Sequence, residues 1–214
     1  MIRKFVLLDV FKVAWKKYIS QIWILTGLII GCVIVNLALN LYIPPPQHGN
    51  MSAAGLALAL FSLVFSLLFS LGYTKNIFQT LDGEEPQFSA YGQEIRKIIT
   101  LFLTGLIYAV TVVLGIALLL FPGFYLAIRF QFFYASIVEE DTGIISSLKR
   151  SWEITKGQEK PLFILLFAEI AIAILGLIVF IIGIFVTIPL IGLMNCYVFR
   201  KLTAFTTEEV TISD

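Results

Sequence analysis

The sequence predicts an all-α membrane protein, a polytopic helical bundle in which six transmembrane helices form three hairpins. Of its 214 residues, 59% are hydrophobic and only 14% are charged. An ordinary soluble domain has about 25% charged residues, so an aqueous domain of this composition lacks the polar groups to cover its surface. Three long stretches contain almost no charge, and the basic residues lie between them. A mean hydropathy of +0.95 likewise indicates that the protein is surrounded by a lipid bilayer. We expect one integral membrane domain over residues 1–214.

The first uncharged stretch, residues 18–74, is long enough for two transmembrane helices. One helix needs about 20 residues to cross about 30 Å of hydrocarbon. Three successive prolines at residues 44–46 interrupt the stretch, and a helix cannot continue through them. We therefore expect spans at residues 22–42 and 52–73.

The second stretch, residues 98–138, contains Arg129 as its one charged residue and the helix-breaking pair Pro122-Gly123 near its middle. This pattern predicts spans at residues 98–121 and 123–139.

The third stretch, residues 161–199, contains only Glu169 as a charge. A single helix of that length would measure about 58 Å, nearly twice the hydrocarbon thickness. The chain must fold back, and we expect the turn at residues 183–187 with Pro189 in the first turn of the returning helix. The predicted spans are residues 161–182 and 185–201, followed by a cytoplasmic tail at residues 202–214.

The basic residues predict the orientation of these spans. All of them except Arg129 lie near the N-terminus, between residues 75 and 97, between residues 149 and 160, or at residues 200–201. Lys and Arg in short loops mark the cytoplasmic side of a membrane. We expect six crossings of a bacterial plasma membrane, with both termini in the cytoplasm.

Two segments outside the spans have helical amphipathic patterns and are expected to lie along the cytoplasmic membrane surface, at residues 3–18 and 144–156. The apolar face of the first comprises Leu7, Phe11, Ala14, Trp15 and Tyr18, and that of the second comprises Ile145, Leu148, Trp152 and Thr155. The candidate contacts with lipid headgroups are Lys12, Lys16, Lys149, Arg150, Trp152 and Lys156. Basic connectors that any multi-pass protein needs are the alternative explanation.

Arg129 and Glu169 are the only charged residues within the predicted spans. An Arg near a helix centre costs about 2.5 to 3.5 kcal/mol on insertion. The predicted depths of the two residues differ by about 8 Å, which their side chains can bridge. We expect an intramembrane ion pair with Gln131, Tyr134 and Asn195 as hydrogen-bond partners. A structural clamp between hairpins and a transport or ligand site are both open interpretations.

Small residues along the first two spans predict close helix packing. Gly27 and Gly31 form a GxxxG motif, which we expect to pack within the molecule. Asn36 and Asn40 are expected to form hydrogen bonds across helices. The small residues of the second span fall on one face and are Gly55, Ala59, Ser62, Ser66 and Ser70.

No enzyme motif is present in the sequence. His48 is the single histidine, so no imidazole pair exists for a metal site or a Ser/His nucleophile. Cys32 and Cys196 lie in predicted spans, where they are expected to be small packing residues. The net charge of +1 gives no general attraction to nucleic acid. We expect no catalytic site, no metal, no cofactor and no nucleic-acid partner.

Three motifs carry a resemblance to known families: FPGFYLAIR at residues 121–129, EED at residues 139–141 before Gly143, and SLKRSWEITKG at residues 147–157. With Pro189, Tyr197 and Arg200, this pattern over residues 98–202 resembles the bacterial six-helix membrane domain fused to glycerophosphodiester phosphodiesterases, and related stand-alone inner-membrane proteins of unknown function. The resemblance implies the fold. It does not imply phosphodiesterase activity, which in those relatives belongs to a separate barrel of about 250 residues.

These observations predict a non-enzymatic protein that binds or organises membrane lipids, or another membrane protein, at the bacterial plasma membrane. The alternative is a small transporter or channel subunit that uses Arg129 and Glu169.

Overall fold

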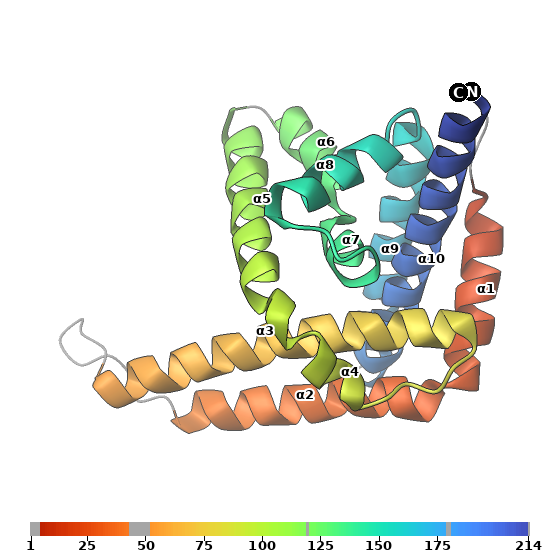
Figure 1. Cartoon of the computed structure of the whole chain (residues 1–214). Coiled ribbons are helices and arrows are strands. Elements are labelled where there is room, and N and C mark those ends of the chain that lie inside the picture. The colour runs from red at the N-terminus through yellow and green to blue at the C-terminus, as the bar shows by residue number, and fades with distance from the viewer. Residues whose placement is uncertain (1–4, 43–51, 119, 179–180, 214) are drawn as a thin grey trace.

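The computed structural model describes residues 5–42, 52–118, 120–178 and 181–213, and all regular secondary structure in these ranges is helical (Figure 1). The elements are α1 (Leu7–Ser20), α2 (Ile22–Tyr42), α3 (Ala53–Asp82), α4 (Ser89–Gln93), η1 (Ile95–Lys97), α5 (Ile98–Leu118), α6 (Leu120–Phe130), α7 (Phe133–Glu139), α8 (Ile144–Ile154), α9 (Glu159–Ile178) and α10 (Ile181–Ser213).

Five helices in the described ranges are long and apolar enough to cross a membrane. Most of their apolar surface is not covered by the rest of the protein, which suits contact with lipid tails and not with water. The chain is therefore a multi-pass membrane protein. The five segments are Ile22–Tyr42, Ala53–Asp82, Ile95–Leu118, Glu159–Ile178 and Gly183–Thr206.

The predicted span at residues 123–139 is not one continuous helix. α6 ends at Phe130, and α7 begins only at Phe133, after a turn at Gln131 and Phe132. The two helices have 11 and 7 residues. They are about 16 and 10 Å long, so neither alone crosses about 30 Å of hydrocarbon.

The boundary between α5 and α6 comes earlier in the sequence than predicted. α6 already begins at Leu120, which places Pro122 in its first turn, where a proline removes no hydrogen bond. Two glycines set the close approach of these helices. A Cβ atom on Gly123 would lie 2.5 Å from the backbone nitrogen of Ile116, and one on Gly115 would lie 2.9 Å from the Gly123 Cα atom.

α9 and α10 pack together in the same manner, through Gly176 and Gly183. A Cβ atom on Gly183 would lie 2.8 Å from the Gly176 Cα atom. Because α10 begins at Ile181, Pro189 lies inside this helix and not in its first turn as predicted. The segment predicted as a tail is also helical, since α10 continues to Ser213.

α2 and α3 lie side by side and extend away from the other helices as a pair (Figure 1). Asn36 of α2 accepts hydrogen bonds from the hydroxyls of Ser62 (3.3 Å) and Ser66 (3.1 Å) of α3, which confirms the predicted bonds across helices for this residue. The prediction is wrong for Asn40, which donates to the Asn36 carbonyl of its own helix. The triple proline run and His48 lie outside the described ranges.

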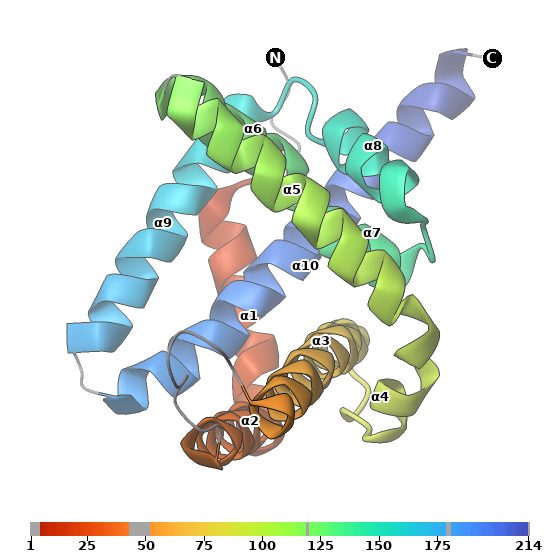
Figure 2. The ribbon, with the colours of Figure 1, turned by 90° about the vertical axis from the view of Figure 1, so that its left-hand side faces the viewer.

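The buried core lies where α1, α3, α7 and α9 surround α10 (Figure 2). α1 contributes Val10, Ala14 and Tyr18, which are four residues apart and therefore share one helix face. Ala14 and Tyr18 of the predicted apolar face are buried, whereas Trp15, which belongs to the same predicted face, is exposed. α1 thus packs against the helices and does not simply rest on a membrane surface.

Candidate functional site

The turn between α6 and α7 is stabilised by side chains of α8. The Ser151 hydroxyl donates to the Arg129 carbonyl oxygen (2.8 Å) and accepts from the Phe132 backbone N–H (3.1 Å). The Thr155 hydroxyl also donates to the Arg129 carbonyl oxygen (3.3 Å). Ser151 therefore replaces one donor and one acceptor that the helix interruption removes from the backbone. The chain therefore breaks its helix at this point with the Arg129 carbonyl oxygen and the Phe132 N–H both hydrogen-bonded.

The Arg129 side chain is 2% exposed and joins three helices. Its guanidinium donates to the Glu159 carboxylate (3.1 Å) and to the Trp152 carbonyl oxygen (2.7 Å). It also lies 4.1 Å from the centre of the Trp152 ring, a distance typical of a cation–π contact. Arg129, Trp152 and Glu159 together are called the Arg129 clamp.

The predicted ion pair between Arg129 and Glu169 is wrong. α6 ends directly after Arg129, so the guanidinium reaches Glu159 at the start of α9. Glu169 lies ten residues further along that helix, a distance of about 15 Å. α6 begins at Leu120, three residues before the predicted start of this span, so Arg129 lies further along its helix than predicted.

Glu169 occupies a separate, apolar environment in the middle of α9. Its side chain is 8% exposed, and its Oε1 atom is buried without a hydrogen-bond partner. The Asn195 amide of α10 lies beside its carboxyl group, and Tyr134 of α7 lies nearby. The structure therefore brings together three members of the predicted polar cluster but leaves Arg129 out. Gln131, in the turn after α6, has a buried amide nitrogen with no hydrogen-bond partner.

α8 is docked into the protein more deeply than predicted. Ser147, Leu148, Ser151 and Ile154 are its buried residues, while Ile145 is 66% exposed. The buried face differs from the predicted one because small serines pack into the core where a hydropathy pattern expects solvent.

The six candidate headgroup contacts divide into two groups. Lys12, Lys16, Lys149 and Lys156 are exposed and available to lipid. Arg150 instead pairs with Glu140 (2.8 Å), which raises the pKa of the guanidinium, and Trp152 belongs to the Arg129 clamp.

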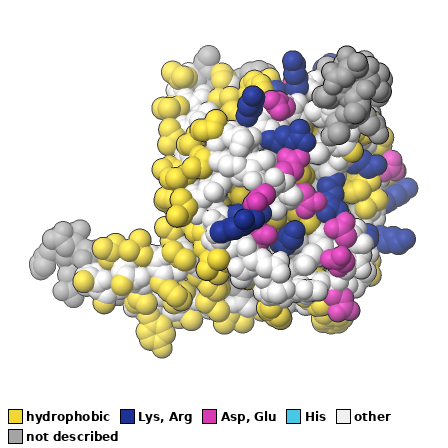
Figure 3. All heavy atoms as spheres, in the orientation of Figure 1, with side chains coloured by type: hydrophobic (Ala, Val, Ile, Leu, Met, Phe, Trp, Pro, Cys, Tyr) yellow, Lys and Arg dark blue, Asp and Glu magenta, His cyan; other side chains and the backbone are white. Residues whose placement is uncertain are grey.

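On one surface, ion pairs link the ends of α3 and α7, the start of α5 and a residue within α10. Arg200 of α10 binds both Asp82 at the end of α3 and Glu139 at the end of α7. Arg96, just before α5, binds Asp141 after α7 (2.7 Å). Figure 3 shows acidic and basic side chains gathered on one part of the molecule, beside a largely hydrophobic part. This set of pairs is called the ion-pair face.

Lys97 is the buried member of the ion-pair face. Its ammonium donates to the Val138 carbonyl oxygen (3.1 Å) and lies 2.8 Å from Glu94 and 3.1 Å from Asp141. Its hydrogen bond and charge hold the pKa of Asp141 below the usual range. The sequence showed which residues are charged but not which of them pair.

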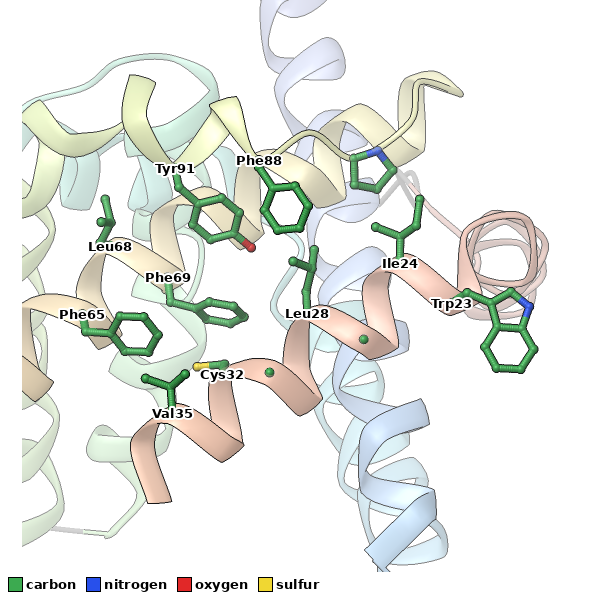
Figure 4. A pocket seen from close by; sticks show the side chains of 13 residues that line it. Trp23, Ile24, Leu28, Cys32, Val35, Phe65, Leu68, Phe69, Phe88 and Tyr91 are labelled. Carbon is green, nitrogen blue, oxygen red and sulfur yellow. The ribbon is translucent and has the colours of Figure 1, made fainter. Parts of the chain in front are cut away.

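An apolar groove of about 720 Å³ lies between α2, α3 and α4 (Figure 4). Gly27 and Gly31 form its floor on α2, and no atom lies within 4 Å of the position of a Cβ atom on either residue. The prediction that this GxxxG motif packs within the molecule is therefore wrong. Cys32 lies next to them in the groove, whereas Cys196 is buried in the core, as expected for a packing residue.

The groove has one hydroxyl group among its lining side chains. The Tyr91 hydroxyl points toward the groove in Figure 4; it is buried, and the Asn76 amide of α3 lies beside it. Trp23, which is 88% exposed, lies at the end where α2 begins, and Phe88, which is 80% exposed, lies further along the groove, nearer Tyr91 (Figure 4). The groove therefore combines apolar walls, one buried hydroxyl and two exposed aromatic rings. No sequence signal marked Tyr91 or Phe88 as members of this site.

No group of three His, Cys, Asp or Glu residues that could hold a metal ion is found within the described ranges.

Comparison with known proteins places the chain in a family. No curated protein and no solved structure matches it. The comparisons do not connect it to the membrane domain of glycerophosphodiester phosphodiesterases, so that resemblance stays a prediction. Residues 88–213, more than half of the chain, match the model of a family described as a domain of unknown function, DUF7847. The chain belongs to the DUF7847 family.

Proposed function

We propose that this protein is a non-enzymatic, six-span protein of a bacterial plasma membrane that binds a membrane lipid in the groove between α2, α3 and α4. The observation that carries the proposal is the open space above Gly27 and Gly31. Both flanking helices are apolar enough to cross a membrane, so this space faces hydrocarbon. An acyl chain fills such a space and regains the dispersion contacts that an empty groove would forfeit.

The chemistry of the groove suits an amphiphile. Its walls are aliphatic and aromatic, and the Tyr91 hydroxyl points toward it. Trp23 lies at the end where α2 begins, and large aromatic residues are common at the membrane–water interface. We therefore place the polar part of the lipid at the Trp23 end and its acyl chain along α2, toward Val35.

A transmembrane helix of a partner protein is the less suitable occupant. Phe88 and Tyr91 lie over one side of the groove, so it is not a long straight channel between two helices (Figure 4). A helix with its side chains is about 10 Å wide and rigid. A flexible acyl chain needs no such straight path.

The ion-pair face supports six crossings with both termini on the cytoplasmic side. The start of α5 and the end of α7 are joined through Arg96 and Asp141, so the intervening chain leaves one face and returns to it. Arg200 links the end of α3 to that same face. Lys and Arg side chains lie among the acidic ones on this part of the molecule (Figure 3), which the positive-inside rule expects of a cytoplasmic surface.

Lipid analysis of purified protein tests the proposal. The wild type and the Gly27→Leu/Gly31→Leu variant would be purified in a mild detergent, and the bound lipid measured by native mass spectrometry. The two leucine side chains occupy the open groove, so we expect the wild type to retain lipid and the variant to lose most of it.

Ala38→Leu is the matched control, because Ala38 is exposed on α2 outside the groove. It should retain as much lipid as the wild type. Equal lipid in all three proteins, each eluting as a single folded species, would overturn the proposal.

Transport by a small carrier or channel subunit is the second candidate function. Two observations favour it: the interrupted helix α6–α7, and Glu169 with its unpartnered oxygen. Discontinuous helices commonly build the substrate sites of transporters. A flux assay in proteoliposomes that compares the wild type with Glu169→Gln tests this alternative.

A further inference from the structure

The Glu169 carboxyl group lacks a positive partner. No salt bridge to Glu169 is present among the described residues, and the polar groups near it, Asn195 and Tyr134, are neutral amide and phenol groups. An ionised carboxylate removed from water without a partner costs several kcal/mol. A carboxylic acid that keeps its proton avoids this cost.

The charged groups on the neighbouring helices are already paired. Arg129 of α6 binds Glu159, and Arg200 of α10 binds Asp82 and Glu139. On α1, Lys12 and Lys16 are exposed and point away from the core. None of these cations is left to neutralise Glu169. The Cys196 thiol lies near Tyr134 and carries no compensating charge.

A metal cation is a poor occupant of this site. Sodium, magnesium and calcium require several oxygen ligands, whereas the surroundings of Glu169 provide one amide and one phenol as nearby polar groups. A proton needs only the carboxyl group itself. The proton is therefore the ligand that this environment suits.

A cavity gives the site a route to its surroundings. Tyr134 lines a cavity of about 430 Å³ between α3, α5 and α7, whose other polar lining residue is Ser70. The other lining residues of the cavity are apolar, so water is held there only beside these two hydroxyl groups. Tyr134 thus lies next to both Glu169 and this space.

We propose that Glu169 is an intramembrane proton-binding site, a neutral carboxylic acid whose proton exchanges with water through the cavity at Tyr134. The exchange is an acid dissociation: the Glu169 O–H bond breaks, a water molecule takes the proton, and the carboxylate recovers a proton by the reverse step. This site is separate from the lipid groove, so either can fail without the other.

Infrared spectroscopy of the protein in lipid nanodiscs tests the proposal. A protonated carboxyl group in an apolar site has a carbonyl stretch distinct from that of a carboxylate, and it shifts when the proton is replaced by deuterium. Near neutral pH, we expect this band in the wild type and its loss in Glu169→Gln. Glu153→Gln, which changes an exposed carboxylate of α8, should retain it.

The cavity is tested by Gly105→Leu, because Gly105 lines it and has no atom within 4 Å of the position of a Cβ atom. A leucine there should slow the deuterium shift of the band severalfold. If Glu169→Gln fails to fold, Glu169→Asp should shift the frequency of the carbonyl band, which assigns this band to residue 169.

Three results would overturn the proposal. They are the absence of the carboxylic acid band in the folded wild type, its persistence in Glu169→Gln, and its disappearance on addition of sodium, which would identify a cation site instead. An exchange rate that Gly105→Leu leaves unchanged would contradict the proposed route.

Discussion

Ser151 shows how one side chain determines a backbone break. Its hydroxyl group binds the Arg129 carbonyl oxygen and the Phe132 N–H, one on each side of the turn between α6 and α7. The sequence of residues 123–139 alone favours a continuous helix, because the group that stabilises the break comes from α8. Local patterns could not reveal it.

Ser151→Ala should therefore lower stability by about 1 to 3 kcal/mol, since it leaves the buried Phe132 N–H without an acceptor. Thermal unfolding in detergent measures the effect. Ser146→Ala removes an exposed hydroxyl from the same helix and should change the unfolding temperature little. Equal effects of the two substitutions would contradict the role assigned to Ser151.

The contact of Asp141 with Lys97 predicts that the stability of the protein decreases at acid pH. Lys97 holds the pKa of this carboxyl group below its ordinary value of 3.8. A group with a lowered pKa stabilises the fold above its unfolded pKa and loses this contribution as the pH falls through the folded value. The loss should therefore occur below about pH 3.8.

Asp141→Asn should remove part of this dependence and lower the unfolding temperature at neutral pH. Asparagine tolerates the left-handed backbone of Asp141 (φ 54°), so the change acts mainly on charge. Unfolding measured across pH checks this, with Asp9→Asn on the exposed side of α1 as the control. Identical pH profiles of Asp141→Asn and wild type would refute it.

At the scale of helices, glycine contacts fix how α5 and α6 pack. The backbone of Gly123 approaches Ile116 so closely that no side chain fits between the two helices. The Pro122-Gly123 pair predicted a turn, but its actual roles are to begin a helix and to permit this contact. Proline and glycine serve either purpose, so sequence alone did not decide between them.

Gly123→Ala should separate α5 from α6 and destabilise the protein by about 1 to 3 kcal/mol. Gly105→Ala on α5 is the control, because the space around Gly105 is open. Alanine favours a helix over glycine at both positions, so any difference between the variants reports the contact. Unfolding temperatures provide the comparison, and a Gly123→Ala protein as stable as Gly105→Ala would argue against the contact.

For the whole molecule, hydrophobic stretches predicted most long helices, because membrane insertion depends on local apolar content. The candidate site was predicted less completely. Glu169, Tyr134 and Asn195 do lie together, but Arg129 pairs with Glu159 at the start of α9, because α6 begins earlier than the sequence pattern indicated. The groove at Gly27 and Gly31 depends on residues from α3 and α4, whose placement no local pattern encodes.

The central claim is that the interrupted α6–α7 segment returns the chain across the membrane, so that the ion-pair face lies on one side. Single cysteines at Gln47 and Ser146, in a protein without Cys32 and Cys196, report the side directly. A membrane-impermeant maleimide is applied to sealed vesicles whose outer surface is the external face. We expect labelling at position 47 and none at position 146 until the vesicles are opened. Labelling of both positions in sealed vesicles would mean five crossings and would contradict the account.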